Sequence, residues 1–141
     1  DWSSDVCSSD LNYAATPATG FAHVYQAGIY KVTIESTFRE ITGSGQLVAI
    51  RALQDNAAAS WTEIPGSYSQ TTLQPFTYLG SPEEGYGIVT RTVLIKLETD
   101  AEVKMQIYST SASGKIESYP LTGVGYQTCA SMTLEYMGLM K

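Results

Sequence analysis

We expect the chain to fold as one all-β domain, built as a sandwich or a barrel. About eight short segments alternate apolar with polar residues, and turns rich in Gly, Pro, Ser and acidic residues separate them. No segment shows the spacing of an amphipathic helix, and 10 Tyr with many Thr and Val favour strands. At 141 residues the chain is long enough to bury one hydrophobic core.

The pattern of each segment predicts which residues face the core. Ile29–Phe38 alternates most regularly, and its even-numbered residues are expected to point inward. Gln46–Leu53 is apolar on both faces apart from Arg51, and Pro75 makes Tyr68–Leu79 an edge or bulged strand. The expected strands are 21–26, 29–38, 46–53, 68–79, 88–97, 103–108, 116–121 and 126–137.

Two of these segments, Ile88–Leu97 and Val103–Tyr108, are predicted to form a hairpin. The acidic stretch Thr99–Glu102 would reverse the chain between them. In the second segment the odd-numbered residues are apolar and the even-numbered ones polar, so the odd-numbered residues are expected to be buried.

The first eleven residues do not follow the strand pattern. Asp1–Leu11 lacks any periodicity, and it lacks the basic start and apolar core of a signal peptide. It resembles the in-frame translation of a sequencing-adapter oligonucleotide, of the kind found at the ends of metagenomic assemblies. We therefore expect residues 1–11 to belong to no domain, residues 12–20 to be a lead-in, residues 21–141 to form the domain, and the native N-terminus to lie upstream.

The charge balance argues against two classes of partner. The chain has 14 acidic and 8 basic residues, for a net charge of -6. Nucleic acids and anionic membranes bind cationic surfaces, so neither is an expected partner. No apolar run approaches the roughly 20 residues that a membrane-spanning helix needs, so no membrane insertion is expected.

No residue pattern predicts a catalytic site or a cofactor. The close acidic pairs, Glu83 with Glu84 and Asp100 with Glu102, lie in expected turns, where carboxylates are usually solvated. His23 has no nearby His or Cys that would complete a zinc site. We expect no bound metal. Calcium at Asp100 and Glu102 is the alternative left open, although two side chains supply fewer oxygens than calcium takes.

Four segments resemble the jelly-roll superfamily of tumour-necrosis-factor ligands and complement-type globular heads, which has phage and bacterial branches. Phe21 followed by Gly28–Val32 resembles the aromatic and Gly-x-Tyr-x-apolar motif of an early strand. Ile64–Ser67 resembles a mid-domain Pro-Gly corner, Val93–Met105 a long strand with its turn and next strand, and Ser131–Met137 the closing strand. The resemblance spans roughly residues 21–137.

The same comparison also shows departures. Val32 stands where the complement pattern has Phe, and Asp100–Glu102 replaces the usual Gly-Asp of the turn. These departures argue against the complement branch itself and leave the broader jelly roll, with its phage or bacterial relatives.

The resemblance implies an antiparallel two-sheet jelly-roll sandwich of about eight strands that assembles as a homotrimer. Aromatic side chains bury a large area at such interfaces at low entropy cost. By position alone, the candidates for the trimer interface are Tyr30, Tyr108, Leu134 and Tyr136. The alternative is that these are ordinary core or surface residues.

Three aromatic residues in or near expected loops are candidates for ligand contact. Trp61, Tyr68 and Tyr86 could stack on sugar rings or anchor a protein partner. The alternative is packing in the core, above all for Trp61.

Together these observations predict a non-enzymatic, trimeric jelly-roll head of a longer fibre or surface protein. The specific expectation is a phage virion fibre or decoration protein, located on a virion or outside the cell, that mediates assembly or binds a cell-surface glycan or protein receptor. A glycan-binding module of a secreted bacterial protein is the first alternative. A fragment of a carbohydrate-active enzyme is the second.

Overall fold

A computed structural model gives the structure of the chain. It describes residues 2–5, 22–40, 46–55, 60–74, 76–79, 81–83, 85–110, 115–116 and 130–139, and at 2–5, 39–40, 46, 76–78, 81–83, 85–86 and 115–116 the backbone alone. All regular structure in these residues is β-strand. None of the described residues forms a helix long and apolar enough to cross a bilayer.

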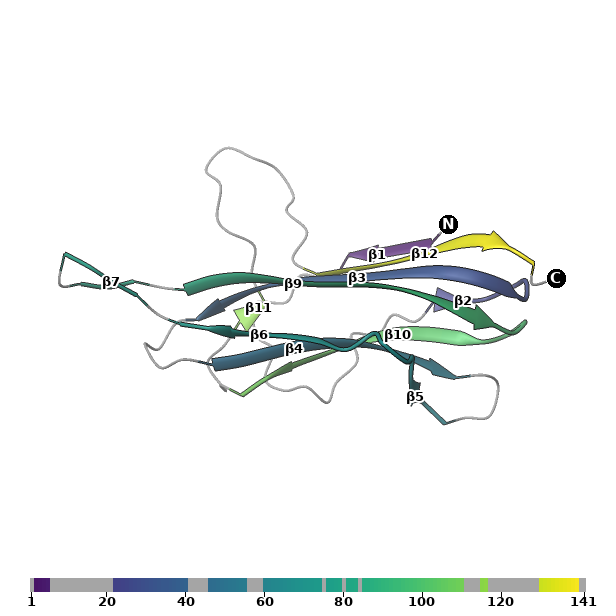
Figure 1. Cartoon of the computed structure of the whole chain (residues 1–141), viewed down its shortest axis with the longest axis horizontal. Coiled ribbons are helices and arrows are strands. Elements are labelled where there is room, and N and C mark those ends of the chain that lie inside the picture. Colours follow the sequence, from purple (N-terminus) through teal and green to yellow (C-terminus); the bar gives the residue numbers. More distant parts are fainter. Residues whose placement is uncertain are drawn as a thin grey trace.

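Two antiparallel sheets of five strands each lie face to face and form a sandwich (Figure 1). The predicted all-β sandwich is confirmed. The strands are β1 (Trp2–Asp5), β2 (Ala22–His23), β3 (Gly28–Glu40), β4 (Gln46–Asp55), β5 (Thr62–Glu63), β6 (Ser69–Leu73), β7 (Phe76–Tyr78), β8 (Ser81–Glu83), β9 (Gly85–Leu97), β10 (Glu102–Ser109), β11 (Lys115–Ile116) and β12 (Ala130–Gly138).

The first sheet, here called sheet A, is centred on β3. Strand β9 pairs with β3 along its whole length, from Gly28 to Glu40. Strands β12 and β11 share the opposite edge of β3, and β1 lies beyond β12. The second sheet, sheet B, is centred on β4. Strand β10 pairs with one edge of β4 and carries β2 beyond it, while β6 and β5 share the other edge.

The hydrophobic core fills the space between the two sheets. The predicted inward face of β3 is confirmed, because Val32, Ile34, Ser36 and Phe38 are buried. Sheet A adds residues of β9 and β12 to the core, and sheet B adds residues of β4 and β10. The other fully buried apolar residues include Val48, Ile50, Ala52, Ile64, Leu97, Ala101 and Val103.

The predicted hairpin of Ile88–Leu97 with Val103–Tyr108 is wrong. Strand β9 pairs with β3 in sheet A, whereas β10 pairs with β4 in sheet B. The turn 98–101 therefore carries the chain from one sheet to the other. It is fixed by hydrogen bonds from Val24 N–H to the Ala101 carbonyl (2.8 Å) and from Asp100 N–H to the Val24 carbonyl (2.8 Å). Alternation shows which face of a strand is buried, but it does not show which strand lies beside it.

The segment that precedes β9 also differs from the prediction. Residues 80–87, expected to form a loop, contain β8 and the start of β9. Residues 68–79, expected to form one weak strand, contain β6 and β7. Strands β7 and β8 pair only with each other among the described residues, and their hairpin projects beyond one end of the sandwich (Figure 1).

Strand β1 lies within the first eleven residues. Trp2–Asp5 pairs antiparallel with Ser131–Leu134 of β12, so this segment occupies an edge position in sheet A. Pairing of this kind uses backbone groups only and does not depend on what the side chains are. The origin of residues 1–11 and the limits of the domain stay predictions.

The predicted turn at Pro65-Gly66 is confirmed. Gly66 has a φ of 79°, and Ser67 N–H donates to the Ile64 carbonyl at 3.0 Å. Pro at the second position and a left-handed Gly at the third are the signature of a type II turn. This turn lies between β5 and β6, which both run antiparallel to β4 along the same edge.

Candidate functional site

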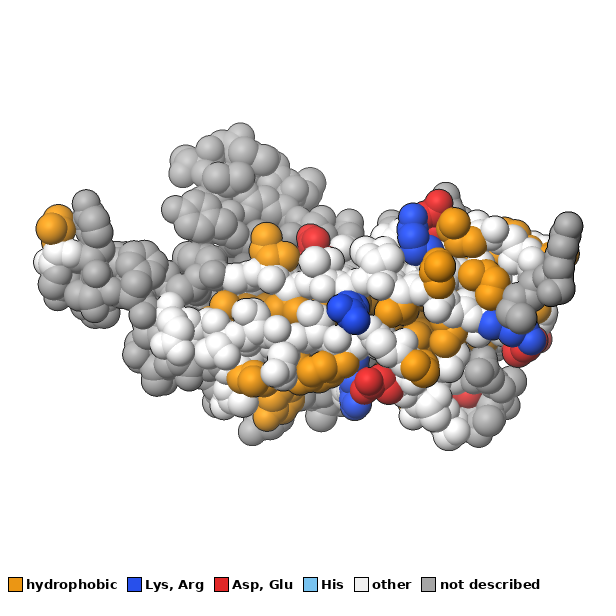
Figure 2. All heavy atoms as spheres, viewed as in Figure 1, with side chains coloured by type: hydrophobic (Ala, Val, Ile, Leu, Met, Phe, Trp, Pro, Cys, Tyr) orange, Lys and Arg blue, Asp and Glu red, His pale blue; other side chains and the backbone are white. Residues whose placement is uncertain are grey.

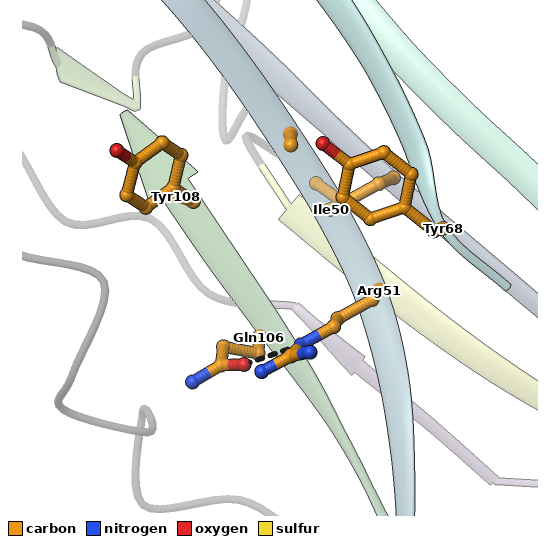
Figure 3. Close-up of a pocket in the computed structure, with 6 residues that line it drawn as sticks. Ile50, Arg51, Tyr68, Gln106 and Tyr108 are labelled. Carbon is orange, nitrogen blue, oxygen red and sulfur yellow. Dashed lines mark hydrogen bonds between the residues drawn. The ribbon is translucent and has the colours of Figure 1, made fainter. Parts of the chain in front are cut away.

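A groove of about 200 Å³ lies on the outer face of sheet B. Three neighbouring strands line it, with Tyr68 just before β6, Ala49, Ile50 and Arg51 on β4, and Gln106 and Tyr108 on β10. Figure 3 shows Tyr68 and Tyr108 on either side of β4, with Arg51 and Gln106 turned toward each other beside them.

The strand register explains why the groove is hollow. Tyr108 lies directly opposite Ala49, and Gln70 of β6 lies on the other side of the same residue. Ala49 has a one-carbon side chain, so the surface between the larger side chains of Tyr108 and Gln70 is recessed. The Tyr68 hydroxyl donates to Gln70 Oε1 at 2.5 Å, which fixes the orientation of that ring. The two tyrosines are each almost half exposed, at 45% and 46%, so both rings are accessible to a ligand.

Polar groups lie one step along the strands from the tyrosines. Arg51 Nε donates to Gln106 Oε1 at 2.6 Å, and these residues are direct partners in the β4–β10 register. Arg51 Nη1 donates to Glu63 Oε2 at 3.0 Å. A guanidinium held on two sides has a fixed orientation, so it can present its remaining N–H groups at low entropic cost.

The ligand-contact candidates fall in different places. Tyr68 lines the groove, and its role in ligand contact stays a prediction. Trp61 is half-buried, and Lys104 Nζ lies 3.8 Å from the centre of its ring, so one face of the indole is already occupied. The side chain of Tyr86 lies outside the described residues.

The four candidates for the trimer interface do not share one surface. Tyr30 and Tyr136 meet at one end of sheet A, with ring centres 5.4 Å apart in an edge-to-face arrangement. Tyr108 lies on the outer face of sheet B, and Leu134 is 4% exposed and belongs to the core. The structure therefore places Leu134 inside its own protomer. An interface role for Tyr30, Tyr108 and Tyr136 stays a prediction.

Tyr30 and Tyr136 are linked by a third residue, Gln26. The Tyr30 hydroxyl donates to the Gln26 carbonyl at 2.7 Å, and Gln26 Nε2 donates to the Tyr136 hydroxyl at 3.2 Å. Burial raises the pKa of Tyr30, and the neighbouring Tyr136 raises it further. The neutral phenol is therefore the form that the fold favours at this position.

The acidic turn is part of a local contact. His23 Nε2 lies 3.1 Å from Asp100 Oδ1, and Glu102 starts β10 opposite His23. Asp100 has a φ of 66°, a conformation that Asp adopts more readily than most residues. No three His, Cys, Asp or Glu side chains gather in the described parts of the chain. The calcium alternative gains no third ligand from these residues. Glu84 and the side chain of Glu83 lie outside the described residues.

Sequence reasoning missed four of the groove residues, namely Ala49, Ile50, Arg51 and Gln106. One signal was present, because Arg51 is the single charge in a strand that is apolar on both faces. A buried-looking strand that keeps one arginine on its outer face favours a local partner for that charge. Which partner it meets depends on the register of β4 with β5 and β10, which the residue pattern does not contain.

The comparisons with known proteins show the fold of the chain, but they show neither its family nor its function. No protein-family description matches the chain, and no curated protein does. Among solved structures, the chain is similar to Eiger TNF from S. frugiperda, with a TM-score of 0.55 and 13% sequence identity. The likeness covers 87% of this chain and 68% of that chain. It carries no catalytic function over to this chain. The expected jelly-roll sandwich is confirmed, and the chain has a TNF-like all-β fold.

Proposed function

We propose that the chain is a non-enzymatic attachment head that assembles as a homotrimer and binds a surface glycan through the groove on sheet B. It would form part of a longer fibre or surface protein, on a virion or outside the cell, with a phage fibre or decoration protein as the specific case. The single observation that supports attachment is the groove itself. Two exposed tyrosines flank a low floor, and a fixed Arg51–Gln106 pair lies beside them.

This arrangement fits the chemistry of a sugar ring. The apolar face of a sugar stacks on an aromatic ring, and its hydroxyls need donors and acceptors at the rim. Tyr68 and Tyr108 offer the rings, whereas Arg51 offers donors. A protein anchor would also fit a hollow of this size, and it is an outcome that the test below separates.

The outward face of sheet A supports the assembly. Ile88 and Leu94 of β9 are 63% and 65% exposed there, beside polar neighbours on β3. The Thr33 and Thr92 hydroxyls lie 3.1 Å apart, and Lys31 pairs with Glu135 across the same face. Exposed aliphatic side chains on a flat strand face are typical of contact surfaces. Packing through sheet A would leave the sheet B groove on the outside of the assembly, because the two outer faces point in opposite directions.

The space-filling view is consistent with separate contact surfaces. Figure 2 shows hydrophobic side chains gathered in several patches, one of them along the lower layer where β4 and β6 run. Charged side chains are few on this side of the molecule. In this proposal, assembly uses the outward face of sheet A and attachment uses the groove on the outer face of sheet B.

The decisive experiment combines light scattering with a glycan array. We expect a trimer at micromolar concentration and binding to a defined set of glycans. Tyr108→Ala and Tyr68→Ala should each weaken binding about fivefold or more, since stacking on one ring contributes roughly 1–3 kcal/mol. Tyr25→Ala is the matched control, because Tyr25 is 83% exposed and lies away from the groove. A monomer without glycan binding would contradict the proposal.

A second candidate function uses the same groove but does not require a trimer. If the chain is monomeric and still binds glycans through Tyr68 and Tyr108, a glycan-binding module of a secreted protein is the better description. The carbohydrate-active enzyme needs two facing carboxylates. Glu63 is a carboxylate in contact with a groove residue, because it pairs with Arg51.

A further inference from the structure

We infer that Glu63 determines which class of glycan the groove accepts, and that it selects uncharged sugars over anionic ones. This inference rests on the proposed glycan binding. Glu63 lies on β5 and pairs with Leu53, the residue two positions from Arg51 on the same face of β4. Its Oε2 lies 3.0 Å from Arg51 Nη1, which is the diagonal contact that neighbouring strands allow.

The positive charge of Arg51 at the groove is balanced by its contact with Glu63. Arg51 is the one charged residue among the six that line the groove. A ligand carboxylate would ordinarily pair with such an arginine in a two-point contact. Here the Glu63 carboxylate already accepts a hydrogen bond from Nη1 of the guanidinium, and Gln106 Oε1 accepts one from Nε. An anionic ligand at Arg51 would therefore come close to Glu63, and like charges at that distance repel.

Lys104, the next positively charged residue on the outer face of sheet B, does not add positive charge to the groove. Lys104 lies on β10, two residues from Gln106, and its Nζ lies over the Trp61 ring. The cation–π contact draws that charge toward Trp61. The chain as a whole carries a net charge of -6, which also disfavours the approach of anions.

The hydrogen-bonding groups at the rim point to the same class of ligand. Arg51 donates only, and the carboxylate of Glu63 accepts only. A sugar hydroxyl both donates and accepts, so two adjacent hydroxyls could satisfy this mixed pair. A carboxylate or sulfate accepts only. It would accept hydrogen bonds from Arg51, but it would offer no donor to Glu63 and would be repelled by the like charge of Glu63.

The test compares neutral oligosaccharides with sialylated and uronate-containing ones on an array and by titration calorimetry. The wild-type chain should bind neutral glycans, and Glu63→Gln should shift the ratio of affinities toward anionic glycans by about fivefold to tenfold. The amide of glutamine keeps the size and one acceptor oxygen but removes the charge. The shift should shrink in high salt, because exposed charges are screened.

The matched control is Glu98→Gln. Glu98 is also exposed and ion-paired, with Lys96 at 2.8 Å, but it lies directly after β9, at the start of the turn between the two sheets. The two variants change the net charge equally. If both shift the ratio alike, the effect comes from net charge and the role of Glu63 is overturned. Wild-type preference for anionic glycans would also overturn it. Absence of binding to either class would overturn the proposed function together with this inference.

Discussion

The side chain of Ser67 serves as a strand partner for the backbone of Ala52. Ala52 N–H donates to Ser67 Oγ at 3.0 Å, and the same hydroxyl donates to the Ala52 carbonyl at 3.1 Å. Both residues are buried. One hydroxyl thereby bonds both backbone groups of Ala52 in β4, and the Ala52 carbonyl also accepts from Ile64 N–H at 2.9 Å. These contacts fix the chain where the Pro65-Gly66 turn ends, directly before Tyr68.

Replacing Ser67 should therefore destabilise the domain and disturb the groove. Ser67→Ala would leave the Ala52 N–H without its buried partner, at a cost of about 1–3 kcal/mol in the free energy of unfolding. Urea denaturation followed by tryptophan fluorescence measures this loss. An unchanged midpoint would show that the hydroxyl contact contributes nothing.

Replacing Ser36, the second buried serine, should have the opposite effect on stability. Ser36 is 0% exposed on the inward face of β3, and its Oγ has no hydrogen-bond partner among the described residues. Burying an unpaired hydroxyl is unfavourable, so Ser36→Ala should leave stability unchanged or raise it by about 1 kcal/mol. The same denaturation experiment compares the two alanine variants directly. A loss of stability in Ser36→Ala equal to that in Ser67→Ala would contradict the account of both sites.

Gly87 should be intolerant of any side chain. It lies opposite Phe38 on the inward face of sheet A, and a Cβ there would collide with Leu73 Cδ2 of sheet B. Gly87→Ala should therefore cost about 1–3 kcal/mol, because the buried Leu73 side chain must leave its present position in the core. Thermal unfolding measures the cost. In the double variant with Leu73→Ala the two losses should be less than additive, since the colliding atom is gone.

The exposed aliphatic residues of β9 should matter only to assembly. Leu94→Lys and Ile88→Lys should each weaken trimer association at least tenfold, because burying one leucine or isoleucine side chain contributes about 1.5–3 kcal/mol. Sedimentation equilibrium measures the association, and circular dichroism should show unchanged folding. Tyr25→Lys is the control at an exposed position on the connection between β2 and β3. Association that resists both β9 variants would place the interface elsewhere.

Tyr30 should make stability depend on alkaline pH. Its pKa in the folded chain is raised above 10.0, by burial first and by Tyr136 second, whereas the unfolded chain keeps the ordinary value. The stability that this shift contributes is fully present below pH 10.0 and is lost as the pH rises through the folded pKa. Tyr30→Phe should remove that part of the pH dependence in urea titrations, and Tyr25→Phe should not. Identical alkaline profiles for wild type and Tyr30→Phe would be inconsistent with the shift.

Much of the fold follows from local patterns in the chain. Alternation in Ile29–Phe38 predicted the inward face of β3, and the Pro65-Gly66 pair predicted a turn, which the structure shows to be of type II. Both depend on interactions between residues near in sequence, namely the two-residue period of a strand and the backbone preferences of Pro and Gly. Tyr68 was recognised as a contact candidate because it stands next to that turn.

Pairing and register depend on residues far apart in sequence. The β9–β10 turn has the length of a hairpin, yet its strands belong to different sheets, because each buries its apolar face against the other sheet and pairs with a distant strand. The groove arises in the same way. Arg51 meets Glu63 and Gln106, and Ala49 lies between Gln70 and Tyr108, only because β5, β6 and β10 align with β4 in one register. The residue pattern fixes which face of each strand is apolar, whereas the packing of two whole sheets fixes which side chains become neighbours.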